Sequence, residues 1–308
     1  TGTDETGADT KVPVDGAEYG LFTEAGDQVA TDWTDADGRI EFTGVLYGKY
    51  YVKELTAAAG YAIDTEEHHF EITRENAGES VGMRLTDRQK GATLTVIKLD
   101  AEGHQRLEGA EFDVKRADGT LVEHVATDDL GEARVRELPW GDYTLTETRA
   151  PKGFVLDTEP REFTVGRDNA DQGIEMRFDN ARKTGSVELV KTDAETGAPL
   201  AGAVYDLYAT DGTLVRDDLP ASGADGKITV TDLAWGSYYF KERTAPAGYS
   251  VSAELVRFAV NASNADAVQT IEATDKAGEA AITIVKEIDA SDYVAAQGEP
   301  TFIFKVER

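Results

Sequence analysis

Three stretches of this chain are versions of one pattern: residues 95–114 read TVIKLDAEGHQRLEGAEFDV, residues 189–208 read LVKTDAETGAPLAGAVYDLY, and residues 8–22 read ADTKVPVDGAEYGLF. Their Gly-Ala pairs align Ala17, Ala110 and Ala203, which gives a period of 93 residues (110 − 17 and 203 − 110). In a chain of 308 residues, this period predicts three repeats, each large enough to bury its own core.

The period also predicts where the repeats begin and end. The first repeat covers residues 1–90, the second 91–182 and the third 183–277, and residues 278–308 open like a partial fourth repeat. The first repeat lacks its opening strand, because TDETG at Thr3 aligns with TDAETG at Thr192 and so places the position of Lys191 on Gly2. We therefore expect the chain to be part of a longer protein.

Strand signals dominate all three repeats. Short alternating runs such as TLTVIK, YTLTE and IEMRF are separated by Asp-Gly turns, as at Asp118 and Asp211. Sustained helical periodicity is hard to find. The pattern predicts an all-β protein of tandem, immunoglobulin-like β-sandwich domains with Greek-key connections and about seven strands per repeat.

Composition excludes several classes of protein. The formal charge of −28, from 31 basic and 59 acidic residues, repels phosphate backbones, so nucleic acid is not an expected partner. No run approaches the roughly 18 apolar residues of a membrane helix, so this fragment is not expected to enter a membrane. Cysteine is absent, which excludes disulfides and thiolate metal sites. No cofactor is expected.

Metal ligands are also poorly represented. His68 and His69 are adjacent, so on a strand they face opposite ways and make a poor metal pair. Asp35 and Asp37 resemble the opening of a calcium loop, but no glutamate completes it, and a hairpin turn explains them better. We expect no metal site.

Strand parity places ionisable or amide residues on apolar faces, because side chains two apart on a strand share a face. The second repeat has three such faces: Leu94, Val96 and Lys98; Tyr143, Leu145 and Glu147; and Ile174, Met176, Phe178 and Asn180. The third repeat matches it with Val187, Leu189 and Lys191; Tyr238, Phe240 and Glu242; and Ile271, Ala273 and Asp275. The first repeat keeps Tyr50, Val52 and Glu54, and Val81, Met83, Leu85 and Asp87, but has no lysine.

A lysine, a glutamate and an amide or acid in one core need a joint explanation, since an isolated buried charge costs several kcal/mol. One explanation is a buried ion pair without a covalent bond. The other is an intramolecular amide bond. Burial lowers a lysine pKa and raises a carboxylic acid pKa, so a neutral Lys98 amine can attack the carbonyl of Asn180 while Glu147 polarises it and transfers the proton.

In that second explanation ammonia leaves from the second repeat. Lys191, Glu242 and Asp275 would react in the same way in the third repeat, with loss of water instead.

At this point the residues resemble a known family. The pattern, and above all ETRAPKGF at 147–154 and ERTAPAGY at 242–249, is similar to the collagen-adhesin B-type (Cna-B) domains, also called SpaA-like prealbumin-type domains, of Gram-positive pilins and surface adhesins. The resemblance covers nearly the whole chain. It implies prealbumin-like sandwiches in which a first-strand lysine joins a last-strand Asn or Asp with a glutamate catalyst.

Carried over position by position, the resemblance implies a Lys98–Asn180 cross-link with Glu147 as catalyst and a Lys191–Asp275 cross-link with Glu242 as catalyst. The first repeat departs from the family, because Glu54 and Asp87 are in place but LTAAAGY lacks the proline and the lysine strand is absent. Lys286 opens the partial fourth repeat without visible partners. Asp87 and Lys286 are therefore unpaired candidates.

The function expected from these features is structural. The chain would be a segment of a cell-wall-anchored, extracellular surface protein of a Gram-positive bacterium, either a pilin subunit or an adhesin stalk, whose cross-links resist tension and proteolysis. Its partners would be other domains or subunits of the same protein or pilus. The alternative is an adhesin that binds a host matrix protein or glycan through the loops of one repeat. A turnover enzyme is not expected, because each cross-link consumes its own residues.

Overall fold

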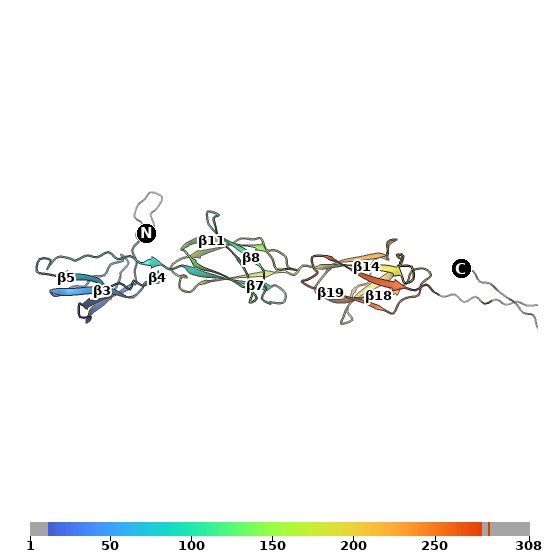
Figure 1. Cartoon of the computed structure of the whole chain (residues 1–308), viewed down its shortest axis with the longest axis horizontal. Coiled ribbons are helices and arrows are strands. Elements are labelled where there is room, and N and C mark those ends of the chain that lie inside the picture. Colours follow the sequence, from blue (N-terminus) through green and yellow to red (C-terminus); the bar gives the residue numbers. More distant parts are fainter. Residues whose placement is uncertain (1–11, 279–282, 284–308) are drawn as a thin grey trace, which may run out of the picture. The chain divides into compact units, whose positions relative to one another are not determined.

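The computed structural model describes residues 12–278 and residue 283, and its regular elements are all β-strands (Figure 1). The strands are β1 Glu18–Thr23, β2 Gln28–Trp33, β3 Gly48–Thr56, β4 Tyr61–Ala62, β5 His68–Ile72, β6 Arg88–Gln89, β7 Ala92–Asp100, β8 Glu111–Arg116, β9 Leu121–Ala126, β10 Glu132–Leu138, β11 Gly141–Arg149, β12 Arg161–Val165, β13 Ile174–Asn180, β14 Gly185–Asp193, β15 Val204–Ala209, β16 Leu214–Arg216, β17 Lys227–Leu233, β18 Gly236–Thr244, β19 Leu255–Val260 and β20 Val268–Asp275.

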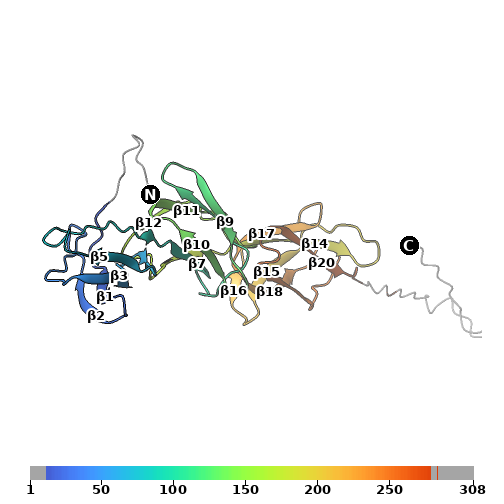
Figure 2. The same ribbon diagram turned by 60° about the vertical axis from the view of Figure 1, so that its left-hand side comes forward.

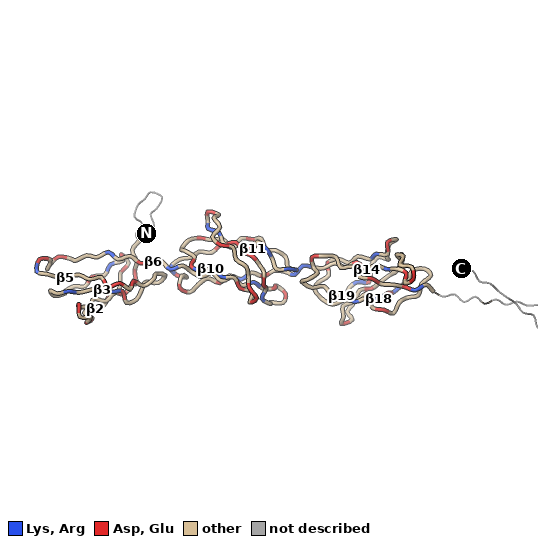
Figure 3. Tube along the Cα trace, in the orientation of Figure 1, with Lys and Arg blue, Asp and Glu red and all other residues tan. Residues whose placement is uncertain are grey.

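The chain divides into two compact units. The first comprises Thr1–Val187, Val230–Ser237 and Phe258–Gln269, and the second comprises Glu188–Thr229, Tyr238–Arg257 and Thr270–Arg308. The repeat boundaries at residues 90, 182 and 277 stay a prediction. Acidic and basic positions are interspersed along the described parts of both units (Figure 3).

The second repeat forms two sheets. One has the strand order β10-β7-β13 and the other β12-β11-β8-β9, so the chain passes from the first sheet to the second and back twice. Figure 2 shows β7 beside β10 and β11 beside β12. Along β7 the side chains at Ala92, Leu94, Val96 and Lys98 are all buried, which matches the period of two read from the sequence.

The lysine strand β7 lies in the middle of its sheet. It pairs antiparallel with β10, where Val135 is opposite Leu94, and parallel with β13, where Phe178 is opposite Lys98. A parallel pair cannot be closed by a hairpin, so the chain between β7 and β13 must build the rest of the sandwich before it returns. The first and last strands of the repeat are therefore neighbours that run in the same direction.

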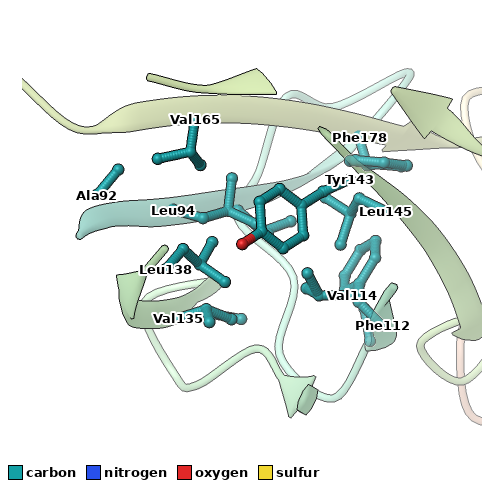
Figure 4. Close-up of a cluster of buried hydrophobic side chains, with 13 residues drawn as sticks. Ala92, Leu94, Phe112, Val114, Val135, Leu138, Tyr143, Leu145, Val165 and Phe178 are labelled. Carbon is teal, nitrogen blue, oxygen red and sulfur yellow. The ribbon is translucent and has the colours of Figure 1, made fainter. Parts of the chain in front are cut away.

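The core of the second repeat fills the space between its sheets (Figure 4). It is made by thirteen buried residues: Ala92, Leu94, Val96, Ala110, Phe112, Val114, Ala133, Val135, Leu138, Tyr143, Leu145, Val165 and Phe178. Each fully buried aliphatic or aromatic side chain contributes about 1.5–3 kcal/mol to stability. This cluster explains why the repeat closes without disulfides.

The third repeat has the same two sheet orders, β17-β14-β20 and β16-β15-β18-β19. The prediction of an all-β protein built from repeated sandwiches of about seven strands is thus confirmed for β7–β13 and β14–β20. None of the described residues forms an apolar helix of membrane-spanning length.

The first repeat differs from the expectation. It has one four-stranded sheet, β2-β1-β3-β5, and the two-stranded pair β4-β6, but residues 39–45 and 81–87 form no strand. The prediction that Val81 to Asp87 form a strand is therefore wrong. In the second repeat the corresponding strands β10 and β13 pair only with β7 within their sheet. Among the described residues no lysine strand lies between these two segments, so neither has a central strand to pair with.

We expect Leu145→Ala to lower the free energy of unfolding of the second repeat by about 2–5 kcal/mol, because Leu145 is fully buried in the cluster of Figure 4 and its loss leaves a cavity. Hydrogen exchange of the β8 and β11 amides measures this change. Val122→Ala on the exposed strand β9 is the control and should change it by less than about 0.5 kcal/mol. Equal effects of the two substitutions would contradict the assigned core.

Candidate functional site

Three polar side chains meet in the core of the second repeat. Lys98 on β7, Glu147 on β11 and Asn180 on β13 are each at most 1% exposed. Lys98 Nζ donates a hydrogen bond to Asn180 Oδ1 and lies 3.1 Å from Glu147 Oε1. Asn180 Nδ2 donates to Glu147 Oε1 at 2.9 Å and to Oε2 at 3.0 Å. The structure thus brings together all three residues that strand parity selected.

The surroundings of the Lys98 amine are aromatic. Its Nζ lies 5.9 Å from the centre of the Phe112 ring and 5.6 Å from that of Phe178, and these rings contact each other edge to face. Burial lowers the pKa of Lys98, although the Glu147 carboxylate acts in the opposite direction. A lowered pKa increases the neutral fraction of the amine, which is the nucleophilic form.

The second compact unit holds the corresponding cluster of Lys191 on β14, Glu242 on β18 and Asp275 on β20, all at most 3% exposed. Lys191 Nζ donates to Asp275 Oδ1 at 2.5 Å and lies 3.4 Å from Glu242 Oε1. The Tyr205 ring centre is 5.7 Å from Nζ. Burial raises the pKa of Glu242, against the hydrogen bond from the Ser252 amide and the charge of Lys191.

Among the described residues of the first repeat, two acidic members of the cluster are found, Glu54 and Asp87. Glu54 on β3 is 2% exposed, and its Oε1 has no hydrogen-bond partner among the described residues. Asp87 is half-buried. Burial raises the pKa of both carboxyl groups, and the charge of Asp87 adds to the rise at Glu54. Lys286, the other unpaired candidate, lies outside the described residues.

Sequence reasoning missed one donor, because it belongs to the backbone. The second carboxylate oxygen of each glutamate accepts a hydrogen bond from the amide ten residues later: Asp64 N to Glu54 at 2.5 Å, Asp157 N to Glu147 at 2.9 Å, and Ser252 N to Glu242 at 2.7 Å. The sequence did carry a signal for this donor, because in all three repeats it lies ten residues after the glutamate, shortly beyond a Gly-Tyr or Gly-Phe turn. This bond fixes the carboxylate so that Oε1 faces the other members of the cluster.

A second group of buried acids was also missed. Asp100 and Asp193 lie two residues after each lysine on the same face. Asp100 Oδ2 accepts hydrogen bonds from Arg182 Nε at 2.9 Å and Nη2 at 2.6 Å, while Asp193 Oδ2 accepts one from the Tyr249 hydroxyl at 2.5 Å. The Tyr249 bond is the main reason that the pKa of Asp193 falls to about 2. Both acids are held by partners outside the lysine clusters.

One group of potential metal ligands is present in the described part. Atoms of Asp64, Glu66 and His68 lie within 4.8 Å of one another. Asp64 Oδ1 already accepts a hydrogen bond from the Glu66 amide, and Oδ2 lies 2.7 Å from His68 Nε2. These bonds give the three residues a structural role in the turn between β4 and β5.

The geometry defines a class of protein: tandem β-sandwich repeats that enclose a lysine, a glutamate and an amide or acid. The sequence matches the family described as SpaA, a prealbumin-like fold domain, over residues 3–86, 92–180 and 185–277. The chain therefore belongs to this family.

Curated relatives include colossin-A of Dictyostelium discoideum, 27% identical over 148 residues, and collagen adhesin of Staphylococcus aureus, 26% identical over 151 residues. These alignments cover 44% and 46% of this chain, but only 1% and 12% of the two relatives. The solved structure of the Bacillus anthracis TIE protein is 27% identical, with a TM-score of 0.45, and the match covers 87% of this chain and 49% of that one.

We expect the stability of the first repeat to fall as pH rises, because burial raises the pKa of Glu54 above its ordinary value of 4.5. A raised pKa in the folded state contributes stability that is complete below the unfolded value and is lost as pH rises through the folded value. Hydrogen exchange of the β1 and β3 amides, corrected for intrinsic rates, measures this slope between pH 4 and pH 8.

Glu54→Gln removes one of the two titrating carboxyl groups and should reduce the slope, leaving the part due to Asp87. The exposed Glu71→Gln on β5 is the matched control and should keep the wild-type slope. An unchanged slope in Glu54→Gln would show that this carboxyl group does not titrate as its burial requires.

Proposed function

We propose that the second and third repeats close themselves by intramolecular amide bonds, Lys98 to Asn180 and Lys191 to Asp275, within a structural segment of a bacterial surface protein. The observation that carries this proposal is the contact of amine, carboxylate and amide inside a core from which water is excluded. An ion pair between Lys98 and Glu147 would not require Asn180. Burying such a pair costs free energy through desolvation, whereas an amide bond removes the charge on Lys98.

The proposed reaction in the second repeat begins with the neutral Lys98 amine, which attacks Cγ of Asn180. A single oxygen, Glu147 Oε1, lies 3.1 Å from the attacking nitrogen and 2.9 Å from the departing one. It can therefore take the proton from Lys98 Nζ and deliver it to Asn180 Nδ2 with little movement. The Nζ–Cγ bond forms, the Cγ–Nδ2 bond breaks, and ammonia leaves.

In the third repeat the electrophile is a carboxylic acid, so one oxygen must leave as water. Lys191 Nζ contacts Asp275 Oδ1, while Asp275 Oδ2 is buried without a hydrogen-bond partner among the described residues. Burial raises the pKa of Glu242, which favours the protonated form of this side chain. The Nζ–Cγ bond forms and the Cγ–Oδ2 bond of the Asp275 carboxylic acid breaks. Glu242 supplies a proton to the departing hydroxyl and receives the proton that Lys191 Nζ loses, so the products are one amide and one water.

The amide would change how the repeat carries force. Lys98 and Asn180 are separated by 82 residues, yet they lie on neighbouring parallel strands. A covalent bond between them passes tension from the first strand to the last and leaves the intervening chain unloaded. Closing a loop of this length also stabilises the fold by about 4–5 kcal/mol in the chain-entropy model.

We also propose where the protein acts. Self-closing repeats suit an extracellular segment anchored to a Gram-positive cell wall, in a pilin subunit or an adhesin stalk, with other domains or subunits of the same protein as partners. The likeness to a protein named collagen adhesin supports this setting. The same likeness favours the alternative, in which the chain binds a host matrix protein or glycan. Saturable binding of this chain to collagen would support that alternative.

Intact mass tests the chemistry directly. We expect the purified chain to weigh less than its sequence mass by one ammonia and one water, one from each closed repeat. Glu147→Ala should restore only the mass of the lost ammonia, and Glu242→Ala only the mass of the lost water. Each substitution removes the glutamate that carries the proton in one repeat. Glu175→Gln, an exposed change on β13, is the control and should keep both losses. A wild-type chain with the full sequence mass would overturn the proposal.

Single-molecule pulling tests the mechanical role. The wild-type second repeat should withhold on the order of 280 Å of extension, which is the length of 82 residues at about 3.3–3.6 Å each. Lys98→Ala should release this length in one unfolding event. An event of that size in the wild-type chain, after the ammonia loss has been verified, would contradict the load path through the amide.

A further inference from the structure

The glutamates of the second and third repeats differ in the donors that reach them. In the second repeat Asn180 Nδ2 donates to Glu147 Oε1 at 2.9 Å and to Oε2 at 3.0 Å. In the third repeat the matching residue is Asp275, and an ionised carboxyl group only accepts hydrogen bonds. Glu242 Oε1 and Asp275 Oδ2 are both buried without a hydrogen-bond partner among the described residues. The third repeat therefore needs a donor that the electrophile itself supplies in the second.

The residue opposite each glutamate differs in a complementary way. Glu147 on β11 pairs with Phe112 on β8. Glu242 on β18 pairs instead with Tyr205 on β15. Both rings are buried, and each lies beside the lysine amine of its own repeat, with its ring centre 5.9 Å from Nζ in the second repeat and 5.7 Å in the third. The two rings thus occupy the same place, and the hydroxyl group distinguishes them.

The Tyr205 hydroxyl is influenced by both acids of its repeat. Burial is the main cause that raises the pKa of Tyr205, and the charges of Glu242 and Asp275 and a hydrogen bond with Glu242 add to the rise. A raised pKa keeps the hydrogen on the hydroxyl group, which is then a donor. A buried tyrosine hydroxyl normally requires a polar partner, and the pairing of β15 with β18 brings Glu242 opposite it.

The first repeat shows the same combination of residues. Tyr19 on β1 pairs with Glu54 on β3, and both side chains are buried. Asp87 precedes Asn180 by 93 residues (180 − 87), so the two residues correspond in the repeat. Burial raises the pKa of Tyr19, and the charges of Asp87 and Glu54 add to the rise. A tyrosine thus accompanies an aspartate in two repeats, and a phenylalanine accompanies an asparagine in the other.

We propose that Tyr205 is a positioning residue for amide formation in the third repeat: its hydroxyl donates a hydrogen bond to Glu242 and replaces the donor that Asn180 supplies to Glu147. The inference rests on the proposed function of the third repeat. The hydroxyl holds Glu242 in place while this glutamate gives one proton to the departing hydroxyl of Asp275 and takes one from Lys191 Nζ. Tyr205 keeps its own proton, so the products are still one amide and one water.

Cell-free synthesis of the full chain, followed by intact mass over time, tests the proposal. Tyr205→Phe should slow the loss of water about tenfold, as expected for the loss of one hydrogen bond, and should leave the loss of ammonia unchanged. Tyr208→Phe, at a half-buried position on the same strand, is the matched control and should lose water at the wild-type rate. A wild-type rate of water loss in Tyr205→Phe would overturn the proposal.

The Asp275→Asn background separates positioning from packing. There the electrophile brings its own N–H donors, so the third repeat should lose ammonia, and adding Tyr205→Phe should change that rate by less than about twofold. A defect in packing or folding would instead slow both backgrounds equally, and that result would overturn the proposal. Hydrogen exchange of the β15 and β18 amides verifies that each variant is folded.

The second repeat allows the reciprocal exchange. The chain carries Lys191→Ala, so that the third repeat cannot react. Asn180→Asp should then lose water slowly in place of ammonia, and adding Phe112→Tyr should speed this loss about tenfold, because the new hydroxyl lies opposite Glu147. No gain in rate from Phe112→Tyr would contradict the assigned role of the hydroxyl.

The same spectra separate this proposal from the function on which it rests. If the wild-type chain loses ammonia and water but Tyr205→Phe does so at the same rates, the role of Tyr205 is wrong and the amide bonds stand. If the wild-type chain keeps its full sequence mass, the amide chemistry is wrong and the role of Tyr205 falls with it.

Discussion

The backbone pairing of the lysine strand holds the second and third repeats together. In the second repeat β7 gives hydrogen bonds to β10 on one side and to β13 on the other, and its inward residues face the four-stranded sheet. In the described part of the first repeat no strand lies between segments 39–45 and 81–87, and both segments are irregular there. One strand therefore decides whether the three-stranded sheet exists.

The same strand places the lysine in the core, and this couples folding to the proposed amide formation. Lys98 is buried on β7, and the pairing of β7 with β13 places Asn180 beside it. Burial lowers the pKa of the Lys98 amine, and the same packing excludes water from the site. The arrangement on which the proposed amide bond depends is thus a property of the folded repeat.

Much of this arrangement could be predicted from the sequence, because strand parity is local. The alternation around Lys98, Glu147 and Asn180 marked each as inward, and the all-β fold followed from regular short strands. The loss of strand at residues 81–87 could not be predicted in that way, since Val81 and Met83 have strand-like spacing but depend on a distant partner. The Asp157 amide could not be predicted from residue type, because it is a backbone donor, and its only signal was its constant distance from the glutamate.

The parallel direction of β7 and β13 also governs how the repeat can be joined to others. Because both strands run the same way, the chain comes in at one pole of the second repeat and goes out at the opposite pole. A copy of such a repeat can be inserted or deleted by recombination without rerouting any loop of its neighbours. The number of repeats is then free to vary during evolution, and the length of the protein can change without any change in its fold.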